Sequence, residues 1–250
     1  MFTPDVLVLC ATAGTIAFVH TLLGPDHYMP FVALSRSRRW TTGKTVRVTL
    51  FCGAGHIVGS VLLGLIGLYI GIQLNVLEWV EGVRGDLAAW ALVAFGLVYM
   101  SLGIRRAYRQ RPHTHWHTHN GVRHSHRHTH EAAHAHPHTG PDTAGTPDTA
   151  GPTSERRTLV GWAIFIIFVL GPCEPLIPLL MFPAASESLT ALFAVTTVFA
   201  VVTLATMLAA VLAGFWGARQ LRLPGVARFG QAIAGGVILS CGLGISILGL

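Results

Sequence analysis

Residues 20–31 read "HTLLGPDHYMPF" and follow a long run without charged residues. The stretch holds three ionisable residues around a Gly-Pro pair, namely His20, Asp26 and His27. Pro25 lacks a backbone N–H and disfavours helical geometry at the residue before it, so a helix that enters this stretch is expected to break at Gly24. An ionisable group inside a membrane costs roughly 2.5–3.5 kcal/mol on insertion scales, so this stretch predicts a functional site.

The composition around this stretch is that of a membrane protein. Of the 250 residues, 52% are hydrophobic and only 11% are charged, which is far from the balance of a soluble domain. Six apolar runs reach the roughly 20 residues that are needed to cross a hydrocarbon core. They lie at about 6–34, 48–74, 87–104, 158–182, 189–217 and 229–250. The sequence therefore predicts an all-α, polytopic membrane protein with six transmembrane helices.

The basic residues predict how these helices are oriented. All but one of the 17 Lys and Arg residues fall in the first, third and fifth connections, and the exception is Arg84. By the positive-inside rule these three connections are cytoplasmic, which places both termini outside. We therefore expect a multi-pass protein of the cytoplasmic (inner) membrane, embedded in the lipid bilayer. The net charge of +6 is then a topology signal, and nucleic acid is not expected as a partner.

The two halves of the chain resemble each other. "LLGPDHYMP" (22–30) is similar to "VLGPCEPLIP" (169–178), and "GLVYMSLGI" (96–104) is similar to "GVILSCGLGI" (236–245). Because each half holds three spans, the second half must enter the membrane from the opposite side. This predicts two inverted three-helix repeats in which helices 1 and 4 are broken. Transporters built in this way bind their substrates near the midplane, where the broken helices meet.

The chain is therefore expected to have three parts. Residues 1–104 would form the first three-helix half, and residues 158–250 the second half. Residues 105–157 would form a disordered, histidine-rich cytoplasmic loop, because the repeated unit in "GPDTAGTPDTAG" is rich in Pro, Gly and Thr and cannot build a core.

The ionisable residues of the predicted spans suggest a metal site. The repeat sets Asp26-His27 opposite Cys173-Glu174, and His56 lies among small residues in "CGAGHIVGS", which would let its ring reach the first span. Imidazole, carboxylate and thiolate together suit a first-row divalent metal better than magnesium or calcium. The alternative is a satisfied core histidine at position 56 and a purely structural Asp-His pair. The candidate metal ligands are His20, Asp26, His27, His56, Cys173 and Glu174.

Most histidines lie in the third connection. Several neutral imidazoles in a flexible chain can close on one ion in many ways, so this segment predicts an auxiliary metal-binding loop. It would capture, buffer or sense metal on the cytoplasmic side, and a cytoplasmic metallochaperone is a candidate partner; the alternative is a solvated linker. The histidines are His113, His115, His117, His119, His124, His126, His128, His130, His134, His136 and His138.

The combination of "HTLLGPDH", "GAGH", the histidine-rich connection and "GPCEPLIP" resembles the nickel/cobalt permease superfamily. That group includes uptake permeases, efflux permeases and membrane proteins associated with urease and hydrogenase maturation. The resemblance implies that His20, Asp26, His27 and His56 are metal ligands or selectivity residues. Five residues separate His20 from Asp26, where the uptake branch has four, and the layout looks more like the efflux branch. The direction of transport therefore stays open.

The function expected from residues and resemblance together is that of a secondary transporter. It would move nickel or cobalt ions, with other divalent transition metals open as substrates, and would need no cofactor. No ATP site is evident in the sequence, and we do not expect an enzyme.

Two other functions remain open at this stage. "GPCEPLIP" is also similar to the Pro-Cys motifs of membrane thiol-disulfide electron conduits, which carry one such cysteine in each inverted half. Here Asp26 takes the first-half position, so the partner thiol of Cys173 is missing. A metal-binding accessory or sensor membrane protein for metalloenzyme maturation would bind metal in the loop without moving it across the bilayer.

Overall fold

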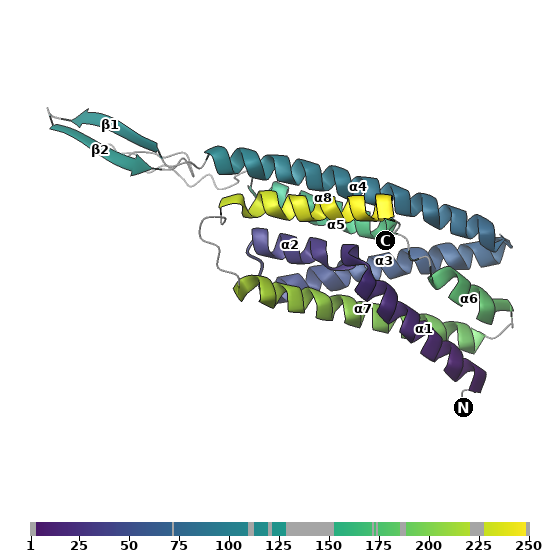
Figure 1. Ribbon diagram of the computed structural model, residues 1–250. Coiled ribbons are helices and arrows are strands. Elements are labelled where there is room, and N and C mark those ends of the chain that lie inside the picture. Colours follow the sequence, from purple (N-terminus) through teal and green to yellow (C-terminus); the bar gives the residue numbers. More distant parts are fainter. Residues whose placement is uncertain are drawn as a thin grey trace, which may run out of the picture.

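The computed structural model describes residues 4–71, 73–109, 113–119, 122–128, 153–171, 173, 175–185, 189–220 and 228–248. The first half contains α1 (Pro4–Leu23), the 3-10 helix η1 (Pro25–His27), α2 (Met29–Ser37), α3 (Thr42–Ile70) and α4 (Leu74–Arg109). A hairpin of β1 (His113–His119) and β2 (Val122–His128) follows. The second half contains α5 (Thr153–Leu170), α6 (Leu176–Ala185), α7 (Leu189–Gln220) and α8 (Gly230–Leu248). The helices form one elongated bundle, and the hairpin extends from one end of it (Figure 1).

Five described helices are long and apolar enough to cross a membrane. They are Pro4–Leu23, Thr42–Ile70, Leu74–Arg109, Leu189–Gln220 and Gly230–Ile247. Their outer faces carry large apolar side chains, such as Phe51 on α3 and Val201 on α7, which are 56% and 60% exposed. Extended exposed apolar surfaces mark contact with a membrane or a partner. The helical bundle therefore fits a multi-pass membrane protein, as the composition predicted.

The predicted fourth span, 158–182, is divided between two helices. α5 ends at Leu170 and α6 begins at Leu176. The N–H of Gly171 donates to the carbonyl oxygen of Ile167 at 3.0 Å, which closes the last turn of α5. The apolar part of α5 is shorter than the five long helices. The break thus falls at the second Gly-Pro pair, as the first break falls at the first pair.

The extent predicted for the second connection, 75–86, is wrong. α4 begins at Leu74 and continues to Arg109, so the charged residues expected in a solvated connection lie on a helix. Glu81 is fully buried, at 0% exposure. Burial is tolerated because Glu81 pairs with Arg84 and because both side chains bind backbone groups of the α5–α6 break, as described below.

The ends of α3 are fixed by local chemistry. The side chain of Thr41 accepts a hydrogen bond from the backbone N–H of Lys44 at 3.3 Å, which caps the start of the helix. At the other end Gly71 has φ of 74°, the left-handed conformation that glycine adopts without a Cβ penalty. α3 therefore starts and stops where its sequence dictates, and this fixes the position of His56 along its length.

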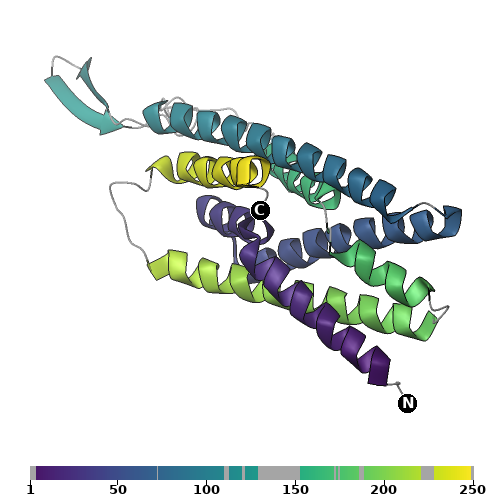
Figure 2. The same cartoon turned by 45° about the vertical axis from the view of Figure 1, so that its right-hand side comes forward.

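The connections of the bundle lie at its two ends. In both views the ends of α2, α4 and α7 and the start of α8 lie toward the end that carries the hairpin (Figures 1 and 2). The N-terminus, the turn between α3 and α4 and the start of α7 lie toward the opposite end. The odd-numbered and even-numbered connections of the predicted topology are thus separated along the long axis.

The histidine-rich segment differs from its prediction where the structure describes it. Disorder was expected throughout 105–157, but 113–128 contains two antiparallel strands. His113 pairs with His128, His115 with His126 and His117 with His124. Histidine at every second position matches the two-residue period of a strand. The dipeptide Asn120-Gly121 also favours a two-residue hairpin turn.

α4 and α8 pack with their backbones in close contact. A Cβ atom added to Gly242 would lie 2.8 Å from the carbonyl oxygen of Ala89 and 2.8 Å from the backbone nitrogen of Val93. Gly96 on α4 and Gly235 on α8 meet the facing backbone at least as closely. Small residues that allow helices to approach are the usual packing device between membrane helices.

Replacing Gly242 by alanine is therefore expected to destabilise the bundle. Overpacking of this kind costs about 1–3 kcal/mol, because the added methyl group meets backbone atoms that cannot move aside. The melting temperature of the purified protein in detergent should fall. Gly230→Ala on the same helix is the control, since a Cβ there meets nothing within 4 Å. Equal melting temperatures for both variants would contradict the close packing of α4 and α8.

Candidate functional site

The first helix break keeps its backbone hydrogen-bonded. Gly24 is extended, with φ of −87° and ψ of 93°, and Pro25–His27 form a single 3-10 turn. The N–H of Gly24 donates to the carbonyl oxygen of His20 at 3.0 Å, and the N–H of His27 donates to that of Gly24 at 3.1 Å. Irregular backbone inside a membrane needs such partners. The chain therefore turns here without leaving these groups unpaired.

Gly24 leaves room for two polar side chains above the break. A Cβ atom added there would lie 2.6 Å from Nδ1 of His27 and 2.9 Å from Oδ1 of Asp26. Because glycine has no side chain, both groups can fold back over the turn. The Gly-Pro pair thus has two separate roles, since Pro25 interrupts the helix and Gly24 makes space.

Three histidine rings meet at this break. The ring centroids of His20 and His27 are 4.9 Å apart, and those of His27 and His56 are 5.4 Å apart. On an unbroken helix, seven residues would separate His20 from His27 by about 10 Å of rise. The break therefore brings the two first-span histidines together, and α3 adds the third. His27, in the middle, is 4% exposed, as is His56.

Each of the two central rings is oriented through its Nδ1 atom. Nδ1 of His27 lies 3.2 Å from the carbonyl oxygen of Gly24 and 3.2 Å from Oδ1 of Asp26. Nδ1 of His56 lies 3.1 Å from the carbonyl oxygen of Phe168 on α5. A carbonyl oxygen only accepts, so both rings donate from Nδ1, and in the neutral form of each ring the lone pair is on Nε2.

The Nε2 atoms of all three histidines are buried without a hydrogen-bond partner in the part of the chain that the structure describes. Four hydroxyl oxygens on α1, α3 and α7 share this property, those of Thr21, Thr49, Ser60 and Thr203. Buried polar groups are nearly always satisfied in proteins, so an unpaired group requires an explanation. Three such imidazole nitrogens lie in one cluster, and a bound ligand would satisfy them.

The second break approaches this cluster through His56. A Cβ atom added to Gly171 would lie 3.3 Å from Nδ1 of His56. The ring of His56 therefore lies between His27 of the first break and the backbone of the second break. This residue connects the two Gly-Pro regions that the sequence singled out.

The other predicted ligands are placed differently. Cys173 is buried in an apolar cluster with Ala17, Leu176, Leu180 and Phe199. Glu174 lies outside the described residues, as do His130, His134, His136 and His138. His113, His115, His117 and His119 lie on β1, and His124, His126 and His128 lie on β2. The cluster that the structure brings together is thus His20, Asp26, His27 and His56.

These groups do not yet form a coordination sphere. Across the described residues, no three His, Cys, Asp or Glu side chains already stand where they could hold one metal ion together. The rings contact one another edge to face, with interplanar angles of 80° and 90°. Binding of an ion by this cluster would therefore require rotation of the rings.

Sequence reasoning missed a polar pair beside the second break. Arg84 is hydrogen-bonded to Oε1 of Glu81, and its Nη2 donates to the carbonyl oxygens of Val169 at 2.9 Å and Gly171 at 3.3 Å. Oε2 of Glu81 accepts from the backbone N–H of Cys173 at 3.1 Å. The available signal was the i,i+3 spacing of an acid and a base, which places them on one helix face.

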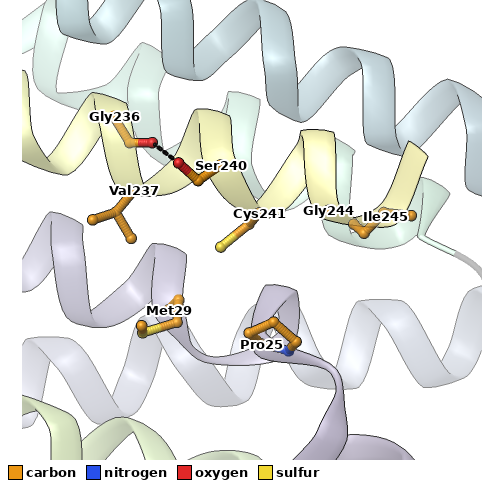
Figure 3. A pocket seen from close by; sticks show the side chains of 8 residues that line it. All are labelled: Pro25, Met29, Gly236, Val237, Ser240, Cys241, Gly244 and Ile245. Atoms are coloured by element: carbon orange, nitrogen blue, oxygen red, sulfur yellow. Dashed lines mark hydrogen bonds between the residues drawn. The ribbon is translucent and has the colours of Figure 1, made fainter. Parts of the chain in front are cut away.

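A cavity lies next to the first break, between α8 and the turn that leads into α2 (Figure 3). Its volume is about 530 Å³. The lining residues are Pro25, Met29, Gly236, Val237, Ser240, Cys241, Gly244 and Ile245. The hydroxyl of Ser240 donates to the carbonyl oxygen of Gly236 at 2.9 Å, and the sulfur of Cys241 points away from α8 toward the segment that carries Pro25 and Met29 (Figure 3). The cavity is mostly apolar and adjoins the residue before Asp26.

Comparison with protein families, with curated proteins and with solved structures gives no match to this chain. The class of the protein therefore rests on its own residues. It is a helical bundle with five candidate membrane-spanning helices and a buried histidine cluster at a helix break.

Proposed function

We propose that this chain is a secondary transporter that moves divalent transition-metal ions, nickel or cobalt above all, across the cytoplasmic membrane. The intramembrane site would consist of His20, His27 and His56, with Asp26 beside them. The observation that carries the proposal is the set of three buried Nε2 atoms at one helix break that have no partner among the residues that the structure describes.

The chemistry of these residues fits a metal substrate. Neutral imidazole is a good ligand for nickel, cobalt, copper, zinc and iron. In metal-bound histidines, the N–H of the second ring nitrogen usually donates a hydrogen bond to a carbonyl or carboxylate. This bond fixes the ring and leaves the other nitrogen for the metal. The carbonyl oxygen of Phe168 is such an acceptor for His56, and the carbonyl of Gly24 and the carboxylate of Asp26 are such acceptors for His27. Rotation of the rings would bring the Nε2 atoms toward one ion.

The charge of a metal ion would be partly balanced at this site. Asp26 is the carboxylate of the cluster, and its side chain is 25% exposed. A divalent ion held by neutral imidazoles beside one carboxylate carries less net charge in the bundle than the ion alone. Ionisable groups in membrane interiors usually mark such substrate pathways.

We further propose that the two halves are inverted repeats, which adds a sixth span formed by α5 and α6. Exchange of the halves maps α1 and α2 onto α5 and α6, α3 onto α7, and α4 onto α8. The packing of α1 on α7 then corresponds to that of α3 on α5, and α2 on α7 to α3 on α6. The α3–α7 and α4–α8 contacts map onto themselves. A pseudo-two-fold axis in the membrane plane would produce this pattern.

The proposed orientation places the hairpin end of the bundle in the cytoplasm and both termini outside. Basic residues gather at that end, at the ends of α2, α4 and α7 and at the starts of α3 and α8. They are Arg36, Arg38, Arg39, Lys44, Arg47, Arg105, Arg106, Arg109, Arg219 and Arg228. Short loops rich in Lys and Arg stay on the cytoplasmic side.

Absorption spectroscopy of bound cobalt tests the proposed ligands. Purified protein should give visible Co²⁺ bands of a nitrogen-ligated site. Nickel and zinc should displace them, and magnesium, which prefers oxygen ligands, should not. A protein lacking residues 113–138 should keep the bands if the intramembrane cluster binds metal. Their complete loss in that deletion variant would contradict the proposed site.

The histidine-rich segment is expected to capture metal ions and not to form part of the pathway across the membrane. In the hairpin, the backbone register sets His113 opposite His128, His115 opposite His126 and His117 opposite His124. Deleting 113–138 should therefore change the apparent affinity for metal or the metal tolerance of cells. The maximal transport rate into vesicles should stay within about twofold, because the intramembrane ligands are untouched. A deletion variant without any transport would show that the segment belongs to the pathway.

A further inference from the structure

We infer that Glu81 and Arg84 are positioning residues, which hold the break between α5 and α6 at the place that aims His56 toward His27. The consequence for metal binding rests on the function proposed above. The structural part of the inference concerns the break alone and can be tested without metal.

The last carbonyl groups of α5 are bound by side chains of the first half. A helix end leaves its final carbonyls without partners inside the helix. Here the carbonyl of Phe168 accepts from His56 as well as from the backbone N–H of Gly171, and those of Val169 and Gly171 accept from Arg84. The guanidinium is suited to this task, because its fixed fork can address two carbonyls and a carboxylate at once.

Glu81 acts on the other side of the same break. Its carboxylate accepts the backbone N–H of Cys173 at 3.1 Å, three residues before the start of α6. The pair thus places a positive group at the end of α5 and a negative group near the start of α6. Each charge is opposite in sign to the partial charge of the helix end near it, which is favourable. The Glu81–Arg84 pair is therefore held in place by the two helix ends as well as by the attraction between its own charges.

His56 and Arg84 bind neighbouring carbonyl groups of one backbone segment. Phe168 and Val169 are consecutive, so a displacement of the Val169 carbonyl also moves the acceptor that orients His56. The packing leaves little freedom for this segment, since a Cβ added to Gly59 would lie 3.1 Å from the carbonyl oxygen of Val169 and 3.5 Å from Nη2 of Arg84. Gly59 is one helical turn from His56 on α3.

A buried ion pair is weak evidence for stability, because desolvation of both charges offsets most of their attraction. Its geometric specificity is the better explanation for its presence here. Four hydrogen bonds join the side chains of His56, Arg84 and Glu81 in the first half to backbone groups of the break in the second half. They fix one half against the other at the level of the histidine cluster.

Cysteine labelling tests the structural part. Cys10, Cys52 and Cys241 are replaced by alanine, which leaves Cys173 as the remaining thiol, and the full-length protein is treated with a small membrane-permeant maleimide. Cys173 is 0% exposed and should react slowly. Glu81→Gln and Arg84→Lys should each raise its rate at least roughly tenfold, since each weakens charge-assisted bonds that close the break. Glu78→Gln, at an exposed position on the same helix, should not change the rate.

Cobalt affinity tests the consequence for the metal. Glu81→Gln and Arg84→Lys should weaken Co²⁺ binding by roughly 10–100-fold, the usual effect of removing groups that orient a ligand. Combining either with His56→Ala should add little further loss, because the pair acts through that ring. Full additivity with His56→Ala would overturn the positioning role.

The double variant Glu81→Leu, Arg84→Met guards against simple misfolding, because it leaves no lone buried charge. It should be membrane-inserted and monodisperse and still show fast Cys173 labelling. Slow labelling in this variant, like that of the wild type, would overturn the inference. If the wild-type protein bound no Co²⁺, the proposed function would fail, while the labelling rates would still decide whether the pair holds the break.

Discussion

Replacing His27 by alanine is expected to reduce the affinity for nickel and cobalt by at least roughly 100-fold. The substitution removes one proposed ligand together with the hydrogen bonds that orient it. His27 is the central ring of the cluster and contacts both His20 and His56. Its loss would leave the other two rings without a shared neighbour, so neither could complete a site alone. Isothermal titration of the purified protein with Ni²⁺ and Co²⁺ measures this effect directly.

Leu22→Ala is the matched control for this variant. Leu22 lies near the end of α1, before the break, and is 46% exposed, so its truncation removes apolar side chain without touching the cluster. It should bind metal as the wild type does. His27→Ala should remain in the membrane, because removal of a buried imidazole also removes an unpaired polar atom. Unchanged affinity in His27→Ala would remove this residue from the site.

Gly24→Ala is expected to have the second largest effect. The backbone of Gly24 is accessible to alanine, with φ of −87°, so the turn itself should form. The added Cβ would lie 2.6 Å from Nδ1 of His27, which forces the ring away from the carbonyl of Gly24 and from Asp26. Metal affinity should fall by roughly 10–100-fold, because the ring is no longer oriented by these groups.

Gly82→Ala separates this steric effect from a general cost of replacing glycine. A Cβ at Gly82 on α4 meets nothing within 4 Å, so metal affinity and melting temperature should both stay at wild-type values. The Gly24→Ala variant should differ from it mainly in affinity. If both variants bind nickel equally well, the close approach of His27 to Gly24 is irrelevant to binding.

The helix break was accessible from sequence because proline chemistry is local. Pro25 determines where α1 ends, and the break then determines that His20 and His27 approach each other, whatever surrounds them. The apolar composition likewise predicted a helical bundle of the membrane type, and five helices confirm that coarse expectation. These properties depend on short stretches or on averages over many residues.

The remaining features depend on contacts between distant segments. The carbonyl of Phe168, which orients His56, is separated from it by 112 residues, and no spacing rule indicates which backbone group a ring will find. Glu81 and Arg84 were assigned to a connection because charged residues usually lie outside the membrane. They are buried because they bind backbone groups of Val169, Gly171 and Cys173 that the second helix break leaves free. This contact depends on how α4 packs against the break, and the sequence does not indicate that packing.

The hairpin was missed for a different reason. The composition of the segment favours disorder. The alternation of residues and the Asn120-Gly121 dipeptide together favour paired strands. The register then places six histidines in three directly opposed pairs. Composition alone indicates that a segment contains metal ligands, whereas period and turn residues indicate how their backbone is arranged.

Uptake of radioactive nickel and cobalt into proteoliposomes of known orientation tests the central claim most directly. The wild-type protein should move both ions, zinc should compete, magnesium should not, and the His27→Ala variant reconstituted to the same density should show only the leak of empty vesicles. Comparison of the two orientations would also give the direction of transport. Wild-type vesicles that accumulate metal no faster than empty vesicles, under conditions in which the protein binds the same ions, would contradict the account.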